Sequence, residues 1–77
     1  MLWTYTRSHQ TLHVETWFDA AMKEYRLVIR RFDGTEQVEI FADTAAFQNR
    51  LSSLERQLEG ESWQTESAVA IHDGWKV

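Results

Sequence analysis

The chain has 77 residues and a formal net charge of -4, with 43% hydrophobic and 26% charged residues. This length supports one small hydrophobic core, and the hydrophobic fraction excludes a wholly disordered chain. The sequence contains no cysteine, which excludes disulfides and thiolate metal sites.

The sequence predicts neither a targeting segment nor a membrane span. The first ten residues, MLWTYTRSHQ, lack the basic start and apolar run of a signal peptide, and no stretch has the roughly 20 apolar residues of a membrane span. We therefore expect a cytoplasmic protein with no membrane partner. Because so short a chain buries a small share of its surface on folding, we also expect association with a second subunit to add stability.

The first half of the chain predicts four strands that follow one another in an antiparallel meander. Apolar and polar residues alternate in its runs, as expected of strands with one buried face. A tight turn near residues 9–10 pairs Tyr5 with Val14. A looser connection through the letters DAAMKE places Phe18 opposite Tyr25. The stronger apolar residues of these strands then share one face, the inner face.

The strongest turn signal is the dipeptide Asp-Gly at positions 33–34, between the runs YRLVIRRF and TEQVEIF. Asp-Gly readily takes the two positive-φ positions of a two-residue type I′ turn. With this turn, Ile29 lies opposite Val38. Leu27 then lies opposite Ile40, so that apolar residues meet across the hairpin. We therefore expect the apolar residues of the fourth strand to face the core.

A helix is predicted after the fourth strand, because the apolar spacing changes from two to three or four. Asp43 is a natural N-cap, and Gly60 is placed to end the helix. The apolar stripe consists of Phe47, Leu51, Leu54 and Leu58. This spacing also suits the start of a coiled coil, but it is short for one. We expect the helix to cover the inner face, which gives a ββββα domain of the α+β class over residues 1–66.

Residues 67–77 are predicted to form a C-terminal tail. Their apolar segment AVAI is either a short strand packed on the domain or an extended piece lying over the sheet, with Trp63 and Trp75 as anchors at either end.

The predicted register collects an unusual mixture of residues on the outer face of the sheet. The set consists of Leu2, Trp17, Arg26, Val28, Arg30, Phe32 and Phe41. Each of the two arginines has a carboxylate in diagonal reach, from Glu15 or Glu39, so a ladder of mixed charge accounts for cations in an acidic protein. The apolar members meet at one end of this face, and a patch of that kind is normally covered.

These residues predict a protein-interaction or homodimeric module that uses the outer face. The apolar end of this face is expected to be covered by the C-terminal tail, by the same face of a second subunit, or by a different protein. Tryptophan and arginine are enriched at protein contacts. The alternative is single-stranded nucleic-acid binding, with rings stacking on bases. The order of strands followed by a helix is also similar, in topology alone, to that of a class of single-stranded-DNA-binding coactivators. The acidic net charge opposes this alternative.

The ionisable residues give little support for catalysis. His13 and Glu15 lie two residues apart on one strand and offer two metal ligands, whereas zinc generally needs three from the protein. The serines lack the context of a nucleophile elbow, and the three glycines lie too far apart for a phosphate loop. We therefore expect no catalytic residue, no cofactor and no metal.

Overall fold

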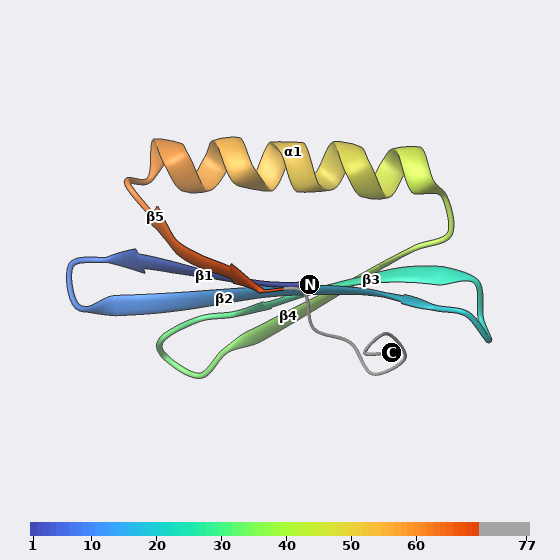
Figure 1. Cartoon of the computed structure of the whole chain (residues 1–77), viewed down its shortest axis with the longest axis horizontal. Helices are drawn as coiled ribbons and strands as arrows, with labels where there is room; N and C mark the ends of the chain where they lie inside the picture. The colour runs from blue at the N-terminus through green and yellow to red at the C-terminus, as the bar shows by residue number, and fades with distance from the viewer. Residues whose placement is uncertain (70–77) are drawn as a thin grey trace.

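The computed structural model describes residues 1–69, which form a five-stranded antiparallel sheet with one helix along one face (Figure 1). The elements in chain order are β1 (Leu2–Arg7), β2 (Gln10–Asp19), β3 (Glu24–Arg30), β4 (Glu36–Phe41), α1 (Thr44–Gly60) and β5 (Gln64–Val69). The strand order across the sheet is β4-β3-β2-β1-β5. The predicted ββββα arrangement of the α+β class is confirmed, and a fifth strand is added to it.

The first two hairpins keep the predicted residues on the predicted faces. The register between β2 and β3 is as expected. Between β1 and β2, Tyr5 lies opposite Leu12 and not Val14, because the turn occupies residues 8–9, where Ser8 takes a φ of 54°. This difference of two positions leaves the inner and outer sets unchanged, since side chains alternate with a period of two.

The β3–β4 hairpin has a three-residue loop and not the predicted two-residue turn. The Gly34 N–H donates to the Arg31 carbonyl at 3.0 Å, and the Arg31 N–H donates to the Thr35 carbonyl at 2.9 Å. Gly34 has a φ of 90°, so the loop resembles a type I turn followed by a left-handed residue. The extra loop residue shifts the pairing by one, and Val28 lies opposite Val38.

This shift moves every side chain of β4 to the other face of the sheet. Val38 and Ile40 are each 50% exposed on the outer face, whereas Phe41 packs against the core on the inner face. The predictions that Val38 and Ile40 face the helix and that Phe41 belongs to the outer face are therefore wrong. The two-residue turn on which they depended is the cause.

Helix α1 begins and ends where the sequence predicts, and its apolar stripe closes the core. The Asp43 carboxylate caps the first turn by accepting from the Ala46 N–H at 3.1 Å. The buried core consists of Tyr5, Leu12, Val14, Leu27, Ile29, Phe47, Leu54, Leu58 and Trp63. The rings of Tyr25 and Phe47 stack with their centroids 4.7 Å apart, which joins β3 to the helix.

Strand β5 returns the chain to the β1 edge and crosses the predicted boundary between residues 66 and 67. Trp63, 7% exposed, anchors its start, with the Arg7 guanidinium 4.4 Å from the ring centroid. The register between β1 and β5 shifts between Thr4 and Tyr5. The second predicted anchor, Trp75, lies outside the described residues. Among the described residues, no helix has both the length and the apolar character needed to cross a membrane.

Candidate interaction surface

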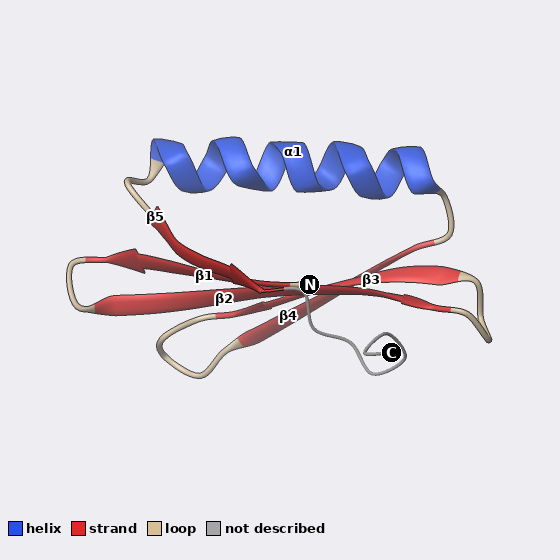
Figure 2. Cartoon of the chain, in the orientation of Figure 1, coloured by secondary structure: helices blue, strands red, loops and turns tan. Residues whose placement is uncertain are grey.

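Within the described part of the chain, α1 covers the inner face of the sheet and no helix covers the outer face (Figure 2). The structure places five residues of the predicted set on the outer face: Leu2, Trp17, Arg26, Val28 and Arg30. Phe32 lies in the β3–β4 loop and is 58% exposed, and Phe41 lies on the inner face. The predicted surface is therefore brought together in its β1–β3 part and not at β4.

The arginines of the outer face are matched by carboxylates. Arg30 contacts Glu15 at 2.6 Å through Nη1 and Glu36 at 2.7 Å through Nε. The contact with Glu15 agrees with the predicted diagonal pairing.

The second arginine takes partners that the sequence analysis did not assign to it. Arg26 Nη2 lies 3.6 Å from Asp19 and 3.9 Å from Glu24. Glu39, its predicted neighbour, lies on the inner face because of the shift in β4. Both strand arginines of the outer face are therefore held in ion pairs, which leaves little free positive charge there.

Apolar side chains lie beside these pairs and form a surface that we call the outer patch, which consists of the exposed Trp17, Val38 and Ile40 and the buried Val28. Trp17 is 38% exposed, and Val28 is 3% exposed. Trp17 lies opposite Arg26, which in turn lies opposite Ile40. Val38 and Ile40 were missed from the sequence because their face depended on the length of the loop at residues 32–34.

The structure places His13 and Glu15 on the outer face, each with a polar neighbour. Within residues 1–69, no three potential ligands come together in a group that could hold an ion. His13 Nδ1 lies 3.3 Å from the Thr4 hydroxyl, and Glu15 is engaged by Arg30. Both side chains therefore belong to the polar network of the outer face.

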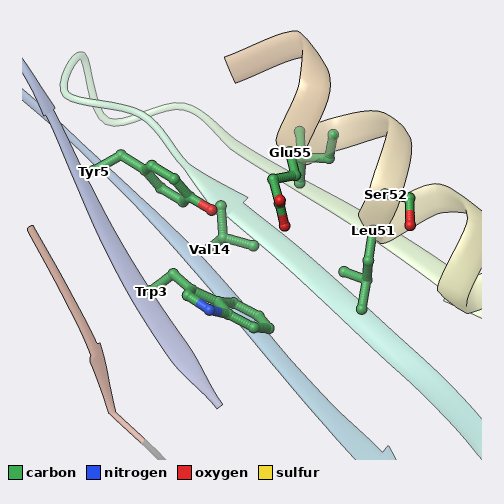
Figure 3. A pocket seen from close by; sticks show the side chains of 7 residues that line it. Trp3, Tyr5, Val14, Leu51, Ser52 and Glu55 are labelled. Carbon is green, nitrogen blue, oxygen red and sulfur yellow. The ribbon is translucent and has the colours of Figure 1, made fainter. Parts of the chain in front are cut away.

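A pocket of about 150 Å³ lies between α1 and the first two strands (Figure 3). The rings of Trp3 and Tyr5 rise from β1, and Leu51 and Glu55 descend from the helix (Figure 3). Burial, with a further contribution from Glu55, raises the pKa of Tyr5 above its ordinary value. The volume is below the roughly 300 to 1,000 Å³ of ordinary ligand sites, which suggests a gap in packing.

An ion pair on the inner face of the sheet connects β4 to the helix. The Arg50 guanidinium donates to Glu39 through Nε at 2.7 Å and through Nη2 at 3.0 Å. These hydrogen bonds lower the pKa of Glu39. The pair explains how a carboxylate occupies an inner position of an edge strand, since its charge is neutralised from the helix.

Comparison with protein families, with characterised proteins and with solved structures gave no match. The function is therefore argued from the surface itself.

Proposed function

We propose that the protein is a non-catalytic, cytoplasmic, homodimeric interaction module that uses the outer sheet face as its contact surface. The observation that carries the proposal is the outer patch, in which Trp17, Val38 and Ile40 expose 38%, 50% and 50% of their surface. These rings and methyl groups lie on a regular sheet and not on a loose loop. Exposed apolar groups gathered on one face are typical of contact surfaces.

A second copy of the chain fits this surface better than an unrelated ligand. A two-fold axis brings the same patch of each copy together, so that apolar groups meet apolar groups without a second specialised surface. The chain is also small, and a domain of this size gains stability from further apolar burial.

Single-stranded nucleic acid is the weaker candidate for the same face. Its binding depends on cations that are free to neutralise phosphates. Arg30 and Arg26 are instead held by carboxylates, and the formal net charge of the chain is -4. Fluorescence anisotropy with labelled oligonucleotides at low salt is the check, and we expect no binding.

The proposal is tested by the oligomeric state of the Ile40→Glu variant. Ile40 lies outside the core, so the variant should fold, and a carboxylate in the patch should raise the dimer dissociation constant by about tenfold or more. Sedimentation velocity over about a hundredfold range of concentration measures this constant. Met22→Glu is the matched control, because Met22 is 61% exposed in the β2–β3 turn and does not belong to the outer patch. A wild-type chain that stays monomeric throughout this range contradicts the proposal.

A further inference from the structure

Strand β4 is a regular strand at the edge of the sheet that residues 1–69 form. Within residues 1–69 it pairs with β3 alone, whereas the opposite edge, β5, carries a shift in its register with β1. The devices that commonly protect an edge are prolines, lysines, bulges and inward-pointing charges. The pairing of β4 is continuous, the strand contains no lysine or proline, and its inward charge, Glu39, is neutralised by Arg50. The edge is therefore able to accept another strand.

The hydrogen-bond alternation of the hairpin identifies the free backbone groups of this edge. The bond from the Arg31 N–H to the Thr35 carbonyl makes these two residues a hydrogen-bonded pair. Because bonded and non-bonded pairs alternate in an antiparallel ladder, Gln37 and Glu39 direct their N–H and C=O groups toward β3. The residues that direct these groups away from β3 are Glu36, Val38 and Ile40.

We infer that β4 pairs antiparallel with β4 of a second copy, about a two-fold axis at Val38, to form a continuous sheet of ten strands, five from each copy. In this register Val38 lies opposite the same residue of the other copy, and Ile40 lies opposite Glu36 of the partner subunit. Each of these pairs exchanges both backbone hydrogen bonds, because their free groups point outward. The inference rests on the proposed function and specifies the contact through which the homodimer forms.

The side chains of the inner face fit this register. Gln37 lies opposite Glu39 of the partner subunit. The Gln37 amide nitrogen donates to Glu39 of its own chain at 2.6 Å, and its second N–H is suited to the partner's carboxylate. A register moved by two residues in one direction places the two Glu39 side chains opposite each other, where like charges repel. A move in the other direction brings the loop at residues 32–34 into the contact and shortens the pairing.

The outer face gains apolar contact from the same arrangement. The Val38 side chains of the two copies then lie opposite each other across the axis, each beside Val28 of its own β3, and each Ile40 lies diagonal to the partner's Val38. Val38 and Ile40 are both half exposed in the single chain, and strand pairing covers part of that surface. The β4 part of the outer patch, Val38 and Ile40, therefore belongs to the same contact as the free edge, which explains why apolar residues lie on the solvent side of an edge strand.

The backbone contact is tested by comparing Val38→Pro with Val38→Ala. Because the Val38 N–H points away from β3, proline removes a hydrogen bond to the second copy and none within the chain. Alanine keeps this N–H and removes methyl groups. We expect Val38→Pro to raise the dimer dissociation constant at least about tenfold more than Val38→Ala does, in sedimentation velocity, with wild-type circular dichroism for both.

The register is tested by placing a charge of either sign at Ile40. These variants also test the strand pairing if the proline variant does not fold. Opposite Glu36 of the partner subunit, Ile40→Glu should weaken the dimer about tenfold or more, whereas Ile40→Lys should leave it within about threefold of wild type. Equal loss in both variants overturns the register.

The outcomes separate this inference from the proposed function. A dimer that dissociates in Ile40→Glu but persists in folded Val38→Pro at the strength of Val38→Ala overturns strand pairing and leaves the outer-face dimer intact. A wild-type chain that is monomeric at every concentration overturns both.

Discussion

A single ion pair, between Glu39 and Arg50, makes the inner position of β4 acceptable to a carboxylate. The side chains are 22% and 26% exposed, so solvent screens the pair only in part. Sequence patterning assigned Glu39 to the outer face, because a charged residue between Val38 and Ile40 reads as the solvent side of a strand. Arg50, the ion-pair partner that makes the inner position possible, lies on the helix eleven residues further along the chain. The alternation of residues within one strand contains no information about this partner.

The pair predicts a specific dependence of stability on pH. Hydrogen bonds from Arg50 lower the pKa of Glu39 from its ordinary value of 4.5, so the folded state is favoured when the carboxylate is ionised. Its contribution is complete above pH 4.5 and is lost as the pH falls through the lowered pKa of the folded state. Glu39→Gln should reduce the free energy of unfolding by about 1 kcal/mol at pH 7 and should change it little at pH 2.

Chemical denaturation at both pH values measures this effect. Glu55→Gln is the control, because Glu55 is exposed on the helix and makes no ion pair among the described residues. An equal loss at pH 7 and pH 2 for Glu39→Gln would show that the ionised pair adds nothing to stability.

The loop between β3 and β4 decides which face of β4 meets the core. Sequence reasoning located this hairpin, the other two hairpins and the helix, because alternation and the capping residue Asp43 are local signals. It could not choose between a two-residue and a three-residue loop, since both use Gly34 at positive φ. The predicted two-residue turn placed Phe41 and Ile40 on the wrong faces. The polar start of β5, QTES, likewise has no strand pattern, and its pairing with β1 is a long-range contact.

Glycine should be required in this loop and dispensable at the end of the helix. Gly34 has a φ of 90° with nothing within 4 Å of an added Cβ, so Gly34→Ala costs backbone strain alone, about 1 kcal/mol of unfolding free energy. Gly60 is helical with similar free space, and Gly60→Ala should stabilise by about 0.5 kcal/mol. Urea denaturation of both variants measures the difference. A stable Gly34→Ala variant would contradict the left-handed geometry of the loop.

The small size of the molecule predicts that its folding is coupled to the proposed association. One helix and one sheet bury a single small core, so the chain depends on further contacts more than a larger domain does. If two copies share a sheet, the folded dimer is favoured by mass action, and thermal stability rises with protein concentration.

Differential scanning calorimetry at several concentrations should therefore show a melting temperature that increases with concentration for the wild type. For Val38→Pro this increase with concentration should begin at higher protein concentration, because its dimer dissociates more readily. A wild-type melting temperature that does not move with concentration would contradict a dimer coupled to folding.

The irregular pairing of β5 determines how far such an assembly can grow. Once two copies join along β4, the outermost strands of the combined sheet are both β5, where the ladder with β1 changes register between Thr4 and Tyr5. A kinked border of this kind is a poor template for another chain. If the β4 dimer forms, this border predicts that growth stops at two copies and does not continue into the fibres that an unprotected flat sheet invites.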